Sequence, residues 1–237
     1  MFGDAGLGLL GLYATWAVFQ GGDYFVDPYL SPFYSPCITA GCPEAIRIIG
    51  LQWWPLSPAL LMMGVILGFR GTCYYYRKAY YRAYLMDPPA CGVGEFRGAG
   101  YKGENSFPFI LQNLHRYFLY ASFVIWGFLT YDAGHAFFFE GRFGVGLGSI
   151  ILLVNLVLLS GYLFGCHSLR HIVGGSVDCY SCSFAGKARH KAWQGVSWFN
   201  RRHMSWAWLS LGFVCITDLY IRLVARGTLV DLSLIHI

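Results

Sequence analysis

The residues best suited to chemistry in this 237-residue chain are the histidines and cysteines of the segment CHSLRHIVGGSVDCYSC, residues 166–182. His167 and His171 are four positions apart, so they share one face of a helix and can both reach one metal ion. A Gly-Gly pair then ends that helix, and the returning chain carries Cys179 and Cys182, whose C-x-x-C spacing lets two thiolates bind one metal. The segment therefore predicts a metal site with two imidazole and two thiolate ligands.

Two kinds of metal site use this ligand set. One is a structural zinc ion held by two cysteines and two histidines. The other is a [2Fe–2S] cluster of Rieske type, with the cysteines on one iron and the histidines on the other. A metal-free segment, with inert cysteines and interfacial histidines, is a third interpretation. Cys166 faces about 100° away from His167 on a helix, so we expect it to be a buried thiol and not a ligand.

The composition is that of a membrane protein. Hydrophobic residues make up 56% of the chain and charged residues 12%, against roughly 25% charged residues in an ordinary soluble domain. Windows of about 20 apolar residues, long enough to cross a bilayer, locate the spans. The expected fold is an all-α integral membrane protein, a single membrane domain with five transmembrane helices in a bundle. The predicted spans are residues 5–22, 56–76, 114–134, 145–166 and 204–224.

The basic residues predict how these helices are oriented. Of the 17 Lys and Arg residues, 13 fall in two connections, residues 70–116 and residues 166–203. Cytoplasmic loops are enriched in Lys and Arg, so both connections are expected to be cytoplasmic. The N-terminus is then cytoplasmic, the C-terminus is outside, and residues 167–203 form a cytoplasmic metal-binding loop of a multi-pass plasma (inner) membrane protein. This arrangement explains the net charge of +5 without nucleic acid as a partner.

Two residue pairs outside this loop are also predicted to interact. Asp218 and Arg222 are spaced i,i+4 in the last span, and we expect an ion pair that anchors the helix end at the membrane surface. Cys37 and Cys42 lie in an outer segment rich in Pro, Gly and aromatic residues. They form a disulfide if the outer compartment is oxidising, and two unpaired thiols are the alternative.

The chain contains no P-loop, nucleotide-binding fingerprint or hydrolase elbow, so its chemistry must come from a bound group. The metal segment lies at the predicted membrane edge, near the aromatic segment HKAWQGVSWFNRRHMSWAW, residues 190–208. These surroundings suit a redox centre that hands electrons to a quinone. Histidine ligation would raise the potential of a cluster above that of an all-cysteine one, and Arg170 would raise it further by stabilising the reduced state.

Haem is the other redox group that the histidines allow. His115 begins the third span and His203 begins the fifth, so this pair near the cytoplasmic face could hold a single haem b. Two haems would need a second axial pair near the outer face. Only His135 and His236 lie there, and His236 is at the extreme C-terminus, so a two-haem arrangement is not expected.

The run GCHSLRHIVGG, followed by DCYSC, at the end of the fourth predicted span resembles the membrane-anchor (cytochrome b-type) subunit of actinobacterial, including mycobacterial, succinate dehydrogenase and fumarate reductase. The resemblance extends over the five-helix body. It implies a subunit of a succinate:menaquinone oxidoreductase that is not itself catalytic. Such a subunit holds the flavoprotein and iron–sulfur subunits at the cytoplasmic face and passes electrons to menaquinone, with or without a further small membrane subunit. The absence of convincing axial histidine pairs departs from haem-bearing anchors and favours the cluster.

A quinone headgroup needs polar donors at the hydrocarbon boundary beside flat apolar walls. The candidates lie at the starts of the third and fifth spans, and they are His115, Arg116, Tyr117, Trp198, Arg202 and His203. Each of them also has an ordinary explanation as an interfacial anchor in contact with lipid headgroups. Two alternatives to the quinone-reducing cluster protein stay open. They are a single-haem cytochrome b anchor subunit and a membrane scaffold whose cytoplasmic loop is braced by zinc.

Overall fold

The computed structural model describes residues 2–38, 42, 57–77, 109–175, 179–182 and 185–236, and these residues are mostly helical. The start of the second predicted span at residue 56 lies outside the described residues, as does much of the connection that follows that span. The main helices are α1 (Phe2–Phe19), α2 (Pro58–Gly71), α4 (His115–His135), α5 (Leu147–Phe164), α6 (His167–Gly174), α7 (Gly186–Asn200) and α8 (His203–Ala225), and a short 3-10 helix η2 (Phe109–Leu114) precedes α4.

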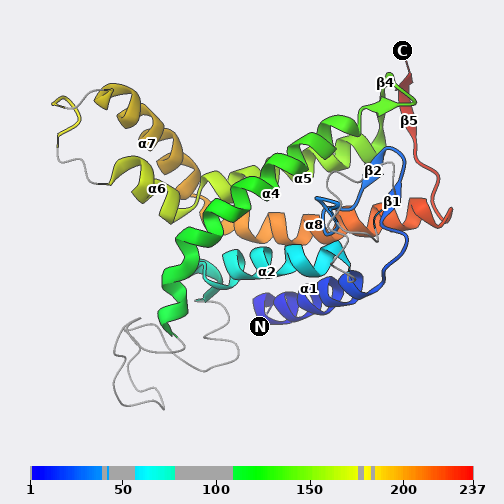
Figure 1. The fold of residues 1–237 in the computed structure, drawn as a ribbon, viewed down its shortest axis with the longest axis horizontal. Helices are drawn as coiled ribbons and strands as arrows, with labels where there is room; N and C mark the ends of the chain where they lie inside the picture. The colour runs from blue at the N-terminus through cyan, green and yellow to red at the C-terminus, as the bar shows by residue number, and fades with distance from the viewer. Residues whose placement is uncertain are drawn as a thin grey trace.

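The long helices lie side by side and alternate in direction along the chain (Figure 1). In this view α1, α4 and α8 run one way, and α2 and α5 run the other way. Helices α5 and α8 pack along each other. A Cβ on Gly161 would lie 2.5 Å from the Trp206 ring, so this close approach of the two helices needs glycine.

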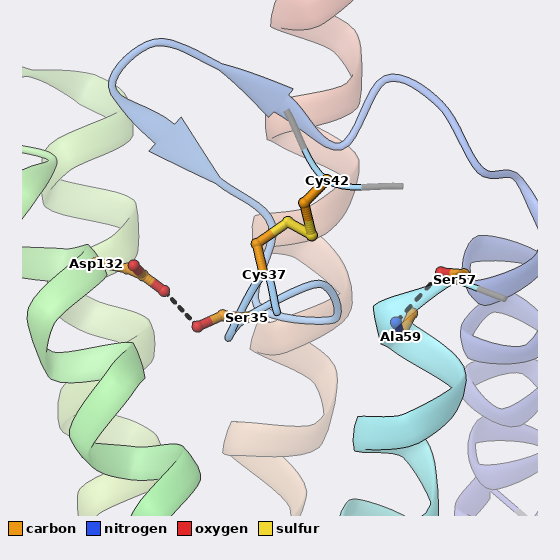
Figure 2. Close-up of a disulfide and its surroundings, with 6 residues drawn as sticks. All are labelled: Ser35, Cys37, Cys42, Ser57, Ala59 and Asp132. Carbon is orange, nitrogen blue, oxygen red and sulfur yellow. Dashed lines mark hydrogen bonds between the residues drawn. A yellow bond between two sulfur atoms is a disulfide. The ribbon is translucent and has the colours of Figure 1, made fainter. Parts of the chain in front are cut away.

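Two of the described helices, α5 and α8, are long and apolar enough to cross a membrane. Shorter apolar helices cover Ala5–Phe19 and Pro58–Gly71. At the start of α2 the Ser57 hydroxyl accepts a hydrogen bond from the Ala59 amide at 3.2 Å (Figure 2). Pro58 occupies the first turn, where the backbone N–H that proline lacks would have no partner within the helix. The apolar windows thus correspond to helices, while the number of spans and their orientation stay predictions.

The fourth predicted span ends earlier than expected. Helix α5 stops at Phe164, Gly165 caps it, and Cys166 has an extended backbone (φ −61°, ψ 135°) that starts α6. The chain thus turns at Gly165–Cys166, before the end of the predicted span at residue 166. His167 and His171 still share one face, since both belong to α6.

Helices α6 and α7 form a hairpin that projects from one end of the molecule (Figure 1). We call residues 167–200 the hairpin, and the end of the molecule that carries it the hairpin end. Arg189 of α7 donates hydrogen bonds to the carbonyls of Val173 (2.5 Å) and Gly175 (2.6 Å), where α6 ends. The two helices are therefore fixed to each other by hydrogen bonds from one arginine to backbone carbonyls.

The opposite end is covered by a segment that we call the cap, residues 22–38. Its strands β1 (Phe25–Val26) and β2 (Tyr29–Leu30) pair antiparallel. Cys37 forms a disulfide with Cys42, and the Ser35 hydroxyl donates a hydrogen bond to the Asp132 carboxylate of α4 (Figure 2). The disulfide is one of the two alternatives that the sequence left open.

A second small sheet lies at the same end (Figure 1). Its antiparallel strands, in the order β3-β4-β5, are β3 (Phe138–Phe139), β4 (Arg142–Gly146) and β5 (Ser233–His236). The Asp231 carboxylate, just before β5, accepts hydrogen bonds from the Tyr29 hydroxyl of the cap (2.5 Å) and from the Gly148 amide of α5 (3.1 Å). The cap is thereby bonded to the ends of several helices.

Asp218 and Arg222 form the predicted ion pair, with Arg222 Nε 2.8 Å from Asp218 Oδ2. The pair is enclosed by protein, because Asp218 is 0% and Arg222 1% exposed, while its predicted place at the level of the membrane surface stays a prediction. The Asp218 carboxylate also accepts hydrogen bonds from the hydroxyls of Tyr13 (2.7 Å) and Ser31. Arg222 donates to the backbone carbonyls of α1 and the cap, at Ala17 (2.9 Å) and Gly22 (2.8 Å). The pair therefore joins α8 to α1 and the cap from within.

Candidate functional site

The four predicted metal ligands of the hairpin lie as two local pairs. The Nε2 atoms of His167 and His171 are 3.0 Å apart, and both side chains are exposed. Partial burial, followed by the nearby charges of His171 and Arg170, lowers the pKa of His167 below its ordinary value. Cys179 and Cys182 form a disulfide, so in this state they do not present two thiolates. Within the described ranges, no three side chains among His, Cys, Asp and Glu converge tightly enough to hold one metal ion.

A second set of two histidines and two cysteines lies inside the molecule, at the hairpin end. His115 Nε2 is 3.2 Å from the Cys166 sulfur, and His203 Nε2 is 3.6 Å from the Cys73 sulfur. His115 and His203 are also close enough to interact electrostatically, and so are Cys73 and Cys166. We call these four residues the buried histidine–cysteine site.

The four side chains come from four different elements. Cys73 follows α2, His115 begins α4, Cys166 lies between α5 and α6, and His203 begins α8. Cys73, Cys166 and His203 are at most 2% exposed. Two thiols and two imidazoles form a soft donor set, suited to iron or zinc and not to magnesium or calcium.

Aromatic rings enclose this site. Phe69 stacks on His115 with ring centroids 4.8 Å apart, and Tyr162 stacks on His203 at 4.9 Å. Phe69 and Tyr162 meet edge to face at 5.3 Å. A Cβ on Gly165 would approach His203 Nδ1 to 3.0 Å and the Gly161 carbonyl to 2.8 Å, so only glycine leaves room for the imidazole here. The wall of the site is therefore packed and largely apolar.

Hydrogen bonding gives His115 the tautomer that a metal ligand needs. The Thr72 hydroxyl donates its single hydrogen to the Gly68 carbonyl (2.6 Å) and lies 2.8 Å from His115 Nδ1. Since that hydrogen is already used, we assign the remaining contact as Nδ1–H donating to the Thr72 oxygen. Nε2 then carries a lone pair and lies beside the Cys166 sulfur. Metal-bound histidines are oriented by the same kind of bond from their second nitrogen.

The donor chemistry of the buried site fits a binuclear cluster. Two thiols and two imidazoles are the ligands of a Rieske-type [2Fe–2S] centre. Each close pair contains one thiol and one imidazole, whereas a Rieske centre takes two thiolates on one iron and two imidazoles on the other, so the fit rests on the kinds of donor and not on this pairing. His203 Nδ1 is buried without a hydrogen-bond partner among the described residues. Buried polar atoms normally have a partner, so this nitrogen is consistent with a group bound at the site.

Sequence reasoning missed Cys73 and assigned Cys166 as a buried thiol. Cys166 is buried, as predicted, with 0% exposure, but it also lies beside a histidine. One signal could have located the set: Cys73, His115, Cys166 and His203 all fall near ends of predicted spans, and the distribution of basic residues predicts these ends to lie on one side of the membrane. Local spacing could not have paired them, because the partners are 51 and 130 residues apart.

An apolar cavity of about 120 Å³ adjoins the site. Phe69, Arg70 and Tyr162 line it beside the site, and Pro32 and Phe33 of the cap line it as well. The Arg70 guanidinium lies 4.8 Å from the centre of the Tyr162 ring, and the Tyr162 hydroxyl is buried without a hydrogen-bond partner. The cavity therefore joins apolar walls to two polar donors near the histidines.

The predicted quinone-binding residues separate into two groups. His115 and His203 belong to the buried site. The remaining four are exposed, and they are Arg116, Tyr117, Trp198 and Arg202. Among these, Arg202 lies over the Trp198 ring at 5.2 Å, as expected of an interfacial anchor.

Comparison with known proteins identifies the family. Residues 1–227 match the family model of the actinobacterial succinate dehydrogenase subunit SdhC. A chain of the solved Mycobacterium smegmatis Sdh1 complex in the apo form is 44% identical, with a TM-score of 0.88, and the match covers 99% of this chain and 89% of that chain. No protein with a curated description matches. The family resemblance read from the sequence is confirmed, and the chain belongs to the actinobacterial SdhC family, the membrane subunit of succinate dehydrogenase.

Proposed function

We propose that this subunit passes electrons from the soluble subunits of a succinate:menaquinone oxidoreductase to a quinone, through a Rieske-type [2Fe–2S] cluster held by Cys73, His115, Cys166 and His203. The observation that carries the proposal is that two buried thiols, a buried imidazole and a half-buried imidazole lie together at one end of the molecule. The cofactor is the one that the sequence predicts, but the ligand set differs from the hairpin set.

The residues around the site would tune and protect the cofactor. When bound, the cluster would take up and pass on one electron at a time, at a potential that histidine ligation raises above that of all-cysteine clusters. Thr72 holds the His115 ring, and Phe69 and Tyr162 keep water away from the donors. Such outer contacts control the affinity and potential of a metal site.

The cavity supports a quinone as the acceptor. A quinone has a flat apolar ring with carbonyl oxygens that accept hydrogen bonds, and its tail is soluble in lipid. The cavity offers apolar walls, the unpartnered Tyr162 hydroxyl and the Arg70 guanidinium. Leu67, another lining residue, is 60% exposed, so the cavity reaches the outer surface of the helices, where lipid would lie. Menaquinone is the acceptor that the family resemblance implies.

The flavoprotein and iron–sulfur subunits are proposed to dock at the hairpin end, which the basic residues place in the cytoplasm. Succinate chemistry then occurs in those subunits, since the described residues show no site for flavin. In this proposed topology, with five spans in the plasma membrane, the buried site would lie on the cytoplasmic side, where the soluble subunits deliver electrons. A metal on His167, His171, Cys179 and Cys182 stays a separate prediction, which requires the disulfide to be reduced.

One spectrum of the purified complex tests the cofactor. Dithionite should produce a Rieske-like paramagnetic signal in addition to the signals of the soluble subunits. Sharp α and β absorption bands would instead indicate haem b on His115 and His203. We favour the cluster because Phe69 and Tyr162 fill the space beside these two imidazoles. A membrane subunit that contains zinc and no iron would contradict both redox assignments.

A side chain that fills the cavity should block quinone reduction. Val214 lines the cavity, and Val214→Phe adds ring volume there. Val157→Phe makes the same change at a valine of α5 that is 55% exposed. We expect Val214→Phe to lower succinate:quinone activity about tenfold or more, in line with the cost of overpacking a site, and Val157→Phe to leave it near that of the wild type. Electron transfer from succinate to a soluble dye and the cluster signal should persist in both variants. Equal quinone activities in the two variants would refute the cavity as the quinone site.

A further inference from the structure

We infer that the groove between α6 and α7 binds the phosphate of an anionic phospholipid. The groove is a hollow of about 320 Å³, and its lining residues carry polar groups, although apolar atoms make up most of its surface. The lining residues are Arg170, Trp193, Gln194, Ser197, Asn200 and Arg201. Neither the family match nor the buried histidine–cysteine site assigns a role to this groove, and the inference does not depend on the cluster proposal.

The groove is positively charged and therefore favours the binding of an anion. Two guanidinium groups line it, and the described part of residues 166–203 contains no Asp or Glu. A guanidinium presents paired N–H donors that match the oxygens of a phosphate. Arg170 uses Nε for the Ser197 hydroxyl at 3.0 Å and lies 5.0 Å from the centre of the Trp193 ring. The arginine is thus positioned in the groove without neutralisation by a described carboxylate.

The walls of the groove are fixed before any ligand binds. Trp193 packs against Gly174, where an added Cβ would lie 2.2 Å from the indole. The Asn200 side chain donates to the Gly165 carbonyl at 2.7 Å, which ties the end of α7 to the end of α5. A site whose donors are held in place binds with less loss of conformational entropy.

The position of the groove selects a lipid over other anions. Arg170 lies six residues after the apolar helix α5 ends at Phe164, and Arg201 lies two residues before α8 begins at His203. Both helices are long and apolar enough to cross the membrane, so the groove lies beside the ends of two candidate spans, at the depth of the headgroups. Basic pockets at this depth bind anionic headgroups.

The test measures lipid retained by the whole complex. The wild-type complex and its variants are placed in phosphatidylcholine nanodiscs with or without phosphatidylglycerol, and bound phosphatidylglycerol is counted by native mass spectrometry. Arg170→Gln and Arg201→Gln should each weaken phosphatidylglycerol binding about tenfold, as expected for loss of a charge-assisted contact. Lys191→Gln is the matched control. It removes the same charge from an exposed position of α7 that does not line the groove, and it should change binding little.

Three results would overturn the inference. Equal lipid binding by all variants would show that the groove holds no lipid. Displacement of phosphatidylglycerol by inorganic phosphate at equal concentration would assign the groove to a free anion. Loss of the soluble subunits from the Arg201→Gln complex, with lipid binding unchanged, would assign it to protein docking. Arg201 is exposed, so we expect Arg201→Gln to leave the hairpin folded. The test can therefore be made with this variant even if Arg170→Gln disturbs the hairpin.

Discussion

Replacing Cys166 with Ser should abolish the cluster signal of the membrane subunit and reduce succinate:quinone activity to the background level. The sulfur lies beside His115 Nε2 and is buried, so a hydroxyl there would be a poor ligand for iron in a site to which the described residues bring no further thiol. Cys73→Ser, which removes the sulfur beside His203, should also abolish the cluster signal and the succinate:quinone activity. Succinate oxidation by a soluble dye should continue in both variants, because the flavoprotein is not altered.

The chain supplies two matched controls for this experiment. Cys215 is also a buried free cysteine, but it lies on α8 away from the four donors, and Cys215→Ser should keep the signal. Cys179→Ser tests the ligand set predicted from sequence alone, and it should keep the signal too. If Cys179→Ser removes the signal and Cys166→Ser does not, the cluster belongs to the hairpin and our ligand assignment is wrong.

Asp218→Asn should be among the most destabilising single changes at the cap end. It leaves the Arg222 guanidinium buried without an anion, although Tyr13 and Ser31 can still bond to the new amide. Breaking a buried pair by removing one charge costs about 3–5 kcal/mol. We expect the midpoint of thermal unfolding to fall by on the order of 10 °C, measured on the detergent-solubilised complex.

Asp23 provides the control for this prediction. It pairs with Arg226 at 2.6 Å, but both side chains are largely exposed, so Asp23→Asn should cost at most about 1 kcal/mol. The double variant Asp218→Leu with Arg222→Met should recover part of the stability, because it removes both charges and keeps apolar volume. If Asp218→Asn and Asp23→Asn unfold at the same temperature, the buried pair does not hold the cap to the helices.

Local patterns in the sequence predicted what neighbouring residues do. Apolar windows located α5 and α8, because a long apolar run with few charges is stable as a helix that crosses or fills an apolar layer. Spacing along a helix predicted the contact between His167 and His171 and the ion pair of Asp218 with Arg222. The motif at residues 166–182 also indicated the correct family.

Tertiary packing decided which ligands meet. His115 and Cys166 are separated by 51 residues, and Cys73 and His203 by 130, so no helical or turn periodicity relates them. The turn at Gly165 separates Cys166 from the exposed hairpin histidines, and the alternating directions of the helices bring four element ends together. The same packing enclosed the ion pair that the sequence predicted, because cap and α1 carbonyls cover Arg222. The sequence by itself thus determined the family and the positions of the long apolar helices, whereas only the fold decided which thiols and imidazoles lie side by side, because their contacts join residues far apart in the chain.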